Sequence, residues 1–318
     1  MEDLGAPRGL IVELITPLTK EGLIHSSSLE KCLSRIAGFA QGIFVAGPRG
    51  GEGLSLSLNA KRELLVQTLE LTKGRIPIMV WITGPNEEET RRTLFGLQSS
   101  VENKEGRDSI FWVDAPLMYH SNRGLPSLYK EYGSITDLPF ILLNDPGLIQ
   151  KAKRPLKRKN IRTAILKELT CLPSVAGLIF VGDLDRANNY QKAARGRSRF
   201  RIYDGDEARF LDYPSLSGVI SVGANLLPRQ WHQVTSSSLH LGGHGQDYPD
   251  SLRQIWFMGQ QLHRVREIYS QAPPLCIKAA LKDLNVIESA FTIEEGPGEL
   301  QGLDDLTGLI KECELPVS

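Results

Sequence analysis

Short apolar runs and amphipathic segments alternate along most of the chain. The apolar runs are rich in Val, Ile and Leu, and glycine, proline or polar residues bound them. Runs of this kind are typical of strands that are buried on both faces, as in a parallel sheet covered by helices. We predict eight such strands, at residues 9–16, 42–46, 77–83, 109–115, 139–144, 174–183, 199–203 and 218–222.

The segments between the predicted strands carry the signals of helices. Ser26 or Ser27 can cap a helix near residues 28–39, and Asn86, followed by three glutamates, opens another. Further helices are expected at residues 58–72, 126–135, 161–169, 184–194 and 207–213. A strand followed by a helix, eight times over, favours an α/β fold of the (β/α)8 or TIM-barrel type over an open sheet. We therefore expect the barrel over residues 1–230 and a C-terminal helical extension, residues 231–318, packed on it.

Composition excludes several classes of protein. The 318 residues carry 37 Lys and Arg against 37 Asp and Glu, so the formal net charge is zero and nothing in bulk indicates nucleic acid or a membrane surface as a partner. No apolar run approaches the roughly 18 residues of a membrane span, and the N-terminus lacks the pattern of a signal peptide. The four cysteines are far apart, without CxxC or Cys/His pairing. Reduced thiols are the simplest interpretation, and we expect a cytoplasmic protein.

Eight ordered motifs across residues 9–285 resemble one family, the dihydrodipicolinate synthase/N-acetylneuraminate lyase family of class I aldolases and lyases. The motifs are ITPLTKEGLI (15–24), GPRGGEGLSLS (47–57), KRELL with KGRIPIMVWITG (61–65 and 73–84), LLNDP (142–146), VAGLI (175–179), YDGDE (203–207), SGVISVGANLLP (217–228) and PPLCIKAAL (273–281). The resemblance implies the same TIM barrel that the alternation of strands and helices predicts. It also implies lyase or aldolase chemistry on pyruvate or another 2-keto acid.

The position that carries this chemistry departs from the family. Family members form a Schiff base between the keto acid and a lysine on strand six, and carried over position by position that lysine falls on Ile179. The strand-five tyrosine, which relays a proton, falls on Leu143. A Schiff base requires an amine whose pKa burial can lower, and isoleucine supplies none. We therefore assign no catalytic residue and expect a scaffold that has lost the imine chemistry.

Three other family positions also differ. The Thr-Thr pair that grips the substrate carboxylate falls on Arg49 and Gly50, with one residue inserted in the loop, and the arginine beyond strand five falls on Leu148. The second tyrosine, which family members lend across a dimer interface, falls near residues 117–119, where Tyr119 is the candidate. By the same resemblance we expect a homodimer or homotetramer, with residues 116–124 at or near the tighter interface.

The glycine-rich stretch after the second strand suits an anion. Its backbone N–H groups can hold a carboxylate or phosphate, and Arg49 adds a planar cation suited to either. An ordinary turn with a solvated arginine is the alternative. The predicted ligand-binding residues, which share the barrel face where the strands end, are Arg49, Gly50, Gly51, Leu143, Ile179 and Ile220.

Two groups of basic residues have alternative interpretations. The run at residues 151–159 can attract an anion, and Lys151 or Lys153 could replace the missing amine, but a solvated loop is the simpler interpretation. The pair His240 and His244 has no carboxylate or cysteine at ligand spacing. We therefore predict no metal site and no cofactor.

Two acids lie among apolar strand residues. Glu13, in the first strand, either points into the barrel as a buried acid with a raised pKa or points outward to a helix lysine or arginine. Asp114, near the end of the fourth strand, is ambiguous in the same way.

Two functions remain open at this point. In the first, the protein binds a small carboxylate or keto acid, or assembles, without Schiff-base catalysis. In the second, it is an active lyase or aldolase that uses a displaced lysine or a non-covalent mechanism.

Overall fold

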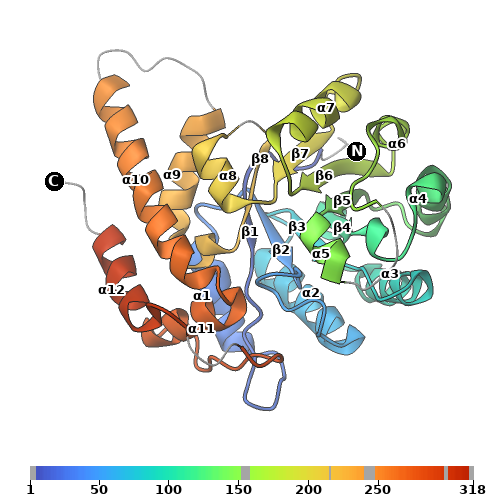
Figure 1. The fold of residues 1–318 in the computed structure, drawn as a ribbon. Helices are drawn as coiled ribbons and strands as arrows, with labels where there is room; N and C mark the ends of the chain where they lie inside the picture. Colours follow the sequence, from blue (N-terminus) through green and yellow to red (C-terminus); the bar gives the residue numbers. More distant parts are fainter. Residues whose placement is uncertain (1–4, 152–157, 215, 240–247, 297–299, 315–318) are drawn as a thin grey trace.

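Eight parallel strands close into a barrel in a computed structural model that describes residues 5–151, 158–214, 216–239, 248–296 and 300–314. Each strand lies beside the strand that follows it in sequence, and β8 pairs with β1 (Figure 1). The strands are β1 (Gly9–Glu13), β2 (Gly42–Val45), β3 (Ile78–Trp81), β4 (Ile110–Asp114), β5 (Phe140–Asn144), β6 (Val175–Phe180), β7 (Arg201–Asp204) and β8 (Gly218–Ser221).

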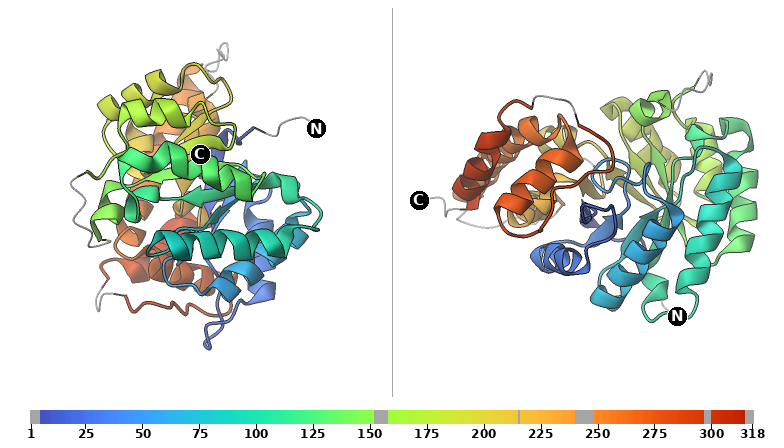
Figure 2. Two further views of the ribbon diagram at one scale, coloured as in Figure 1. Left: turned by 90° about the vertical axis from the view of Figure 1, so that its right-hand side faces the viewer. Right: turned by 90° about the horizontal axis from the view of Figure 1, so that it is seen from below.

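Helices surround the barrel, as the two turned views of the ribbon show (Figure 2). Those that connect or follow the strands are α1 (Ser26–Ile36), α2 (Leu58–Thr72), α3 (Glu87–Val101), α4 (Leu125–Ile135), α5 (Pro146–Lys151), α6 (Thr163–Leu169), α7 (Leu184–Ala194), α8 (Glu207–Asp212) and α9 (Pro228–Leu239). The C-terminal helices are α10 (Tyr248–Tyr269), α11 (Pro273–Asp283) and α12 (Leu303–Glu314). The predicted TIM barrel with C-terminal helices is confirmed.

Most of the differences from the sequence prediction are at the ends of elements. The sixth strand was expected to extend to residue 183, but β6 ends at Phe180. Asp183 is instead the N-cap of α7, where its side chain accepts a hydrogen bond from the amide of Arg186 at 2.7 Å. An N-cap carboxylate satisfies a helix amide that has no partner within the helix. Local capping chemistry therefore shortens the strand.

The C-terminal helices lie along one side of the barrel (Figure 1). α9 contacts β1 and β8, α10 contacts α9 and α12, and α11 contacts both α10 and α12. The expected boundary at residue 230 falls inside α9, and the division into barrel and extension remains a prediction.

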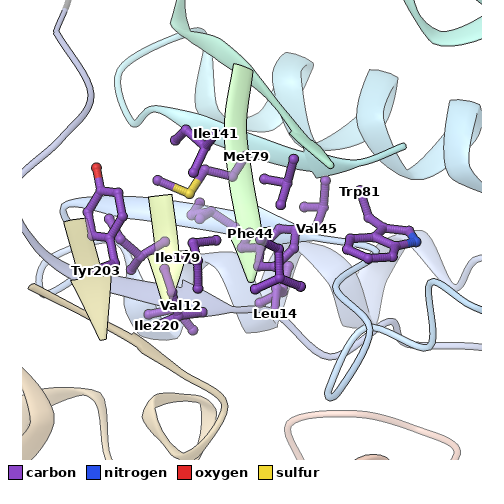
Figure 3. Packing of buried hydrophobic residues seen from close by; sticks show 14 of the residues in the cluster. Val12, Leu14, Phe44, Val45, Met79, Trp81, Ile141, Ile179, Tyr203 and Ile220 are labelled. Carbon is purple, nitrogen blue, oxygen red and sulfur yellow. The ribbon is translucent and has the colours of Figure 1, made fainter. Parts of the chain in front are cut away.

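The strand register determines which side chains face the interior of the barrel. Paired residues of neighbouring parallel strands point to the same side, and the pairs Ile11 with Ile220, Glu13 with Phe44, and Leu143 with Ile179 belong to the inner side. Figure 3 shows the packing of buried side chains, several of them on this inner side. The labelled residues that the register places on the inner side are Phe44, Met79, Trp81, Ile141, Ile179, Tyr203 and Ile220.

Candidate functional site

A glycine-rich loop, residues 46–53, follows β2 at the barrel mouth, by which we mean the C-terminal ends of the strands. Ala46 and Glu52 take φ angles of 51° and 54°, which residues other than glycine rarely adopt. At Gly53 a Cβ atom would lie 1.7 Å from the carbonyl oxygen of Ala46, so only glycine fits. The Gly53 amide donates to the Gly47 carbonyl at 3.0 Å, which folds the loop back over the end of β2.

Glu13 ends β1 with its carboxylate inside the mouth. Its Oε1 atom accepts hydrogen bonds from the amides of Arg49 and Gly50, both at 2.7 Å, and the residue is 2% exposed. Burial raises the pKa of Glu13 above its usual 4.5; Arg49 and the two loop amides oppose this rise, and Glu207 adds to it. Of the two orientations that the sequence allowed, the inward one is confirmed.

The guanidinium of Arg49 spans the mouth. Its Nη2 atom donates to Oδ2 of Asp145 at 2.8 Å, and its Nη1 atom donates to the carbonyl of Gly205. Burial acts to lower the pKa of Arg49, but the carboxylates of Asp145, Glu13 and Glu207 raise it overall. Asp145 also holds the start of α5, because its Oδ1 atom accepts the amides of the next helical turn. Arg49 is therefore tied into the mouth, with 34% of its side chain exposed.

A second carboxylate network lies beside the first. Oε1 of Glu207, at the start of α8, accepts from the Ser221 hydroxyl at 2.6 Å and the Gly223 amide at 2.8 Å. Its Oε2 atom accepts from the Tyr269 hydroxyl of α10 at 2.9 Å. Burial, and then the Glu207 charge, raise the pKa of Tyr269 well above its usual range. The network joins β8 to the C-terminal helices.

A cavity of about 660 Å³ opens outside these networks, and we call it the outer cavity. Arg49 and Asp145 lie in its wall together with Lys151 of α5. The rest of the wall comes from the glycine-rich loop, the start of α11 and residues 292–296. Three further carboxylates also line it, those of Glu52, Glu294 and Glu295.

The predicted ligand-binding residues separate into two sets. Only Arg49 lines the outer cavity. Leu143, Ile179 and Ile220 are 4%, 1% and 3% exposed and lie with the inward side chains of the barrel. Gly50 is buried and its amide is bonded to Glu13, and Gly51 is buried too, with its carbonyl accepting the Thr16 hydroxyl at 2.8 Å. The structure therefore brings these residues to one end of the barrel, with Arg49 at the outer cavity and the other five buried.

Among the described residues, lysines reach the site only from outside the barrel. None of the eight strands contains a lysine. Lys278 of α11 is fully buried and donates to Glu52 and to the Phe291 carbonyl, the latter at 2.8 Å. Lys151 is exposed at the outer cavity. Lys153, the other candidate from the sequence, lies outside the described residues.

Asp114 faces away from the barrel interior, towards α4. Its carboxylate accepts from the hydroxyls of Thr83, Tyr119 and Tyr129, each at 2.6 Å, and the residue is fully buried. Burial raises the pKa of Asp114, and the three hydroxyl donors oppose that rise. Tyr119 is 5% exposed and lies 3.3 Å, hydroxyl to hydroxyl, from Tyr132. Tyr119 is thus held inside its own chain.

Sequence reasoning missed two members of the mouth. Asp145 and Glu207 stood inside quoted motifs, LLNDP and YDGDE, but neither received a role. A carboxylate one or two residues past a predicted barrel strand is a signal that could have identified Asp145. For Glu207, the partner Tyr269 is 62 residues away in sequence, and no spacing rule connects the two.

The part of the chain that the structure describes contains neither a candidate metal site nor a candidate membrane-spanning helix. No group of three or more His, Cys, Asp or Glu residues there could hold a metal ion; His240 and His244 lie outside it. Among the helices of the described ranges, none combines the length and the apolar composition that crossing a membrane needs.

Comparison with known proteins gives consistent matches. The family model described as the dihydrodipicolinate synthetase family matches residues 6–294. A 4-hydroxy-tetrahydrodipicolinate synthase of Ralstonia nicotianae is 27% identical over 293 residues, which is 91% of this chain and 92% of the relative. One from Alcanivorax borkumensis is 24% identical over 97% of this chain and 98% of its own length.

Solved structures share the fold. A dihydrodipicolinate synthase from Bacillus anthracis superposes with a TM-score of 0.78 at 17% identity and covers 99% of this chain and 100% of its own. The chloride-inhibited dihydrodipicolinate synthase from Acinetobacter baumannii, solved with pyruvate, superposes with a TM-score of 0.76 at 21% identity, over 97% and 99% of the two chains.

Proposed function

The chain belongs to the dihydrodipicolinate synthetase family, and on that premise we propose that it binds a small carboxylate-type ligand without forming an imine. The single observation that carries the proposal is that residue 179, at the end of β6, is an isoleucine. In the register it pairs with Leu143 on one side and Tyr203 on the other, on the inner side of the barrel. An imine requires an amine at the reacting carbon, and the strands that form the barrel offer none.

The outer cavity supports non-covalent binding. Of the residues that the structure describes, Arg49, through the part that stays exposed, and Lys151, through its ammonium, are the cations in its wall. Arginine and lysine both bind carboxylates, the first through a planar fork and the second as a point charge. Leu148, Pro274 and Leu275 supply an apolar side against which a short carbon chain can pack. A ligand with one carboxylate and a small apolar body fits this wall.

Calorimetry with pyruvate tests the binding. We expect the wild-type protein to bind pyruvate, and Lys151→Ala to weaken the affinity about tenfold, equivalent to about 1.4 kcal/mol. Lys159→Ala is the matched control, because Lys159 belongs to the same basic run but donates to Gln150 at 2.7 Å and does not line the cavity. No binding by the wild-type protein, or equal losses in the two variants, would reject the proposed ligand site.

An active lyase or aldolase is the second candidate, and one observation favours it. Lys151 lines the outer cavity, so its amine could attack a keto acid held there, form an imine and release water. Borohydride would reduce that imine to a stable secondary amine. A trapped adduct on Lys151 would select this candidate over the first.

A further inference from the structure

Inside the barrel mouth, an anion-binding site is already occupied by a carboxylate of the protein itself, that of Glu13. Two consecutive amides, those of Arg49 and Gly50, converge on Oε1 of Glu13 at 2.7 Å each. Successive backbone N–H groups that point at one spot form an anion-binding site. The positive charge of Arg49 also acts to lower the pKa of Glu13, so it favours an anion at this position.

The surrounding chain is shaped to the Glu13 side chain. A Cβ atom on Gly47 would lie 2.4 Å from Oε1 and 2.5 Å from Cδ of Glu13, so the missing side chain makes room for the carboxylate. Asn225 fixes the backbone of the same residue, because its Nδ2 atom donates to the Glu13 carbonyl at 2.8 Å. Glu13 is 2% exposed, so its carboxylate is closed off from bulk solvent.

We propose that Glu13 is a built-in occupant of this amide site and determines specificity by excluding ligand carboxylates from the inner mouth. Small monocarboxylates are then confined to the outer cavity, a consequence that rests on the proposed function. The exclusion itself rests only on the geometry of Glu13. It acts by occupancy: a side chain of the same shape without charge fills the site equally well, and a shorter side chain opens it.

Removing the side chain should create a site for an external carboxylate. We expect the melting temperature of Glu13→Ala to rise in acetate, by about 2 °C at about ten times the Kd, relative to chloride at equal ionic strength. Glu13→Gln should show no such rise, because its amide oxygen can accept from both loop amides. Val12→Ala is the control for lost stability alone, because Val12 is a fully buried neighbour on the same strand that holds no polar group.

Each measurement is repeated in proteins that also carry Lys151→Ala, which removes the expected outer-cavity contact. The acetate response of Glu13→Ala should persist in the Lys151→Ala background. The test of Glu13 therefore gives a result even if the proposed ligand site in the outer cavity is wrong. A Glu13→Ala protein with equal melting temperatures in acetate and chloride overturns the proposal. A response of Glu13→Gln as large as that of Glu13→Ala also overturns it, because charge rather than occupancy would then exclude the anion.

A second variant keeps the test decisive if Glu13→Ala is poorly stable. Gly47→Ala places a methyl group against Glu13, so it should lower the melting temperature of the wild-type protein and lower it much less in the Glu13→Ala background. If Glu13→Ala does not fold in chloride, its refolding yield in acetate is compared. Equal effects of Gly47→Ala in both backgrounds, or no refolding in either salt, contradict the proposal.

Discussion

At the scale of single residues, the main feature of the barrel mouth is its set of buried charged side chains. Three carboxylates act on the one guanidinium of Arg49, and each of them has at least one further hydrogen-bond donor. A buried charge is costly unless it is paired and hydrogen-bonded. The mouth meets this requirement from within the chain, so its three carboxylates have partners before any ligand arrives.

Lys61 of α2 is a largely buried charge for which the described residues supply no ion pair or hydrogen bond. The residue is 6% exposed, and burial lowers the pKa of its amine from 10.5 to about 8. Below pH 8 the folded chain bears the full cost of a buried ammonium, and the cost falls as the pH rises from 8 to 10.5, where the unfolded chain holds the extra proton. We predict that Lys61→Met raises the free energy of unfolding at pH 7 by about 1–3 kcal/mol.

Urea unfolding between pH 7 and 10.5 measures this effect. The gain should shrink towards the upper end of that range. Arg62→Met, an exposed cation beside it on the same helix, should change stability by less than about 0.5 kcal/mol. Destabilisation by Lys61→Met at pH 7 would mean that the amine has a partner.

The sequence could predict the position of a residue only where a local motif or an alternating strand pattern determines it. Ile179 was placed at the end of β6 by the VAGLI motif, and the register agrees with that placement. The orientation of Glu13 stayed open because its two amide partners belong to a loop 36 and 37 residues further along. An alternating strand pattern shows which residues share a side, not which loop folds over them.

At the scale of elements, one buried ion pair clamps the glycine-rich loop to α11. Lys278 Nζ donates to Glu52 Oε2, and the Glu52 Oε1 atom accepts from the Ile293 amide at 2.7 Å. Burial lowers the pKa of Lys278, and the Glu52 charge opposes that change. The pair holds the loop against the C-terminal segment that walls the outer cavity.

Breaking this clamp should be costly. Lys278→Met leaves Glu52 buried and without its cation, and we predict a loss of about 3–5 kcal/mol in the free energy of unfolding. The paired change Lys278→Met with Glu52→Gln should recover much of that loss, because no lone charge remains. Lys282→Met, an exposed position on the same helix, is the control. Similar losses for Lys278→Met and Lys282→Met in urea unfolding would disprove the clamp.

The elements themselves were largely predictable, and their ends were not. All eight strands were expected, since apolar runs and capping residues are local signals. α5 was not expected, because the carboxylate that caps it, Asp145, follows β5 directly and replaces a turn with a short helix. Strand ends depend on such side-chain-to-backbone bonds, which the apolar pattern does not contain.

For the whole molecule, the closed barrel follows from the order of strands and helices, whereas the assembly state is still a prediction. We predict a homodimer or homotetramer at micromolar concentration, with residues 116–124 at or near the tighter interface. Tyr119 cannot be lent to a neighbour while its hydroxyl is bonded to Asp114, so the contact would involve the exposed members of that segment. Multi-angle light scattering decides the state, and a monomer would refute this prediction.

One measurement tests most directly whether this family barrel lacks imine chemistry. The wild-type protein is incubated with pyruvate and borohydride, and its intact mass is recorded. We predict an unchanged mass, because the family resemblance places the imine-forming amine and the proton-relaying hydroxyl at Ile179 and Leu143, which pair on neighbouring strands and carry neither group. Ile179→Lys should allow trapping at best, since one restored member does not rebuild a cooperating site. A wild-type protein that gains one reduced pyruvyl group would contradict the account, and Lys151→Ala would then show whether the outer cavity holds the reacting amine.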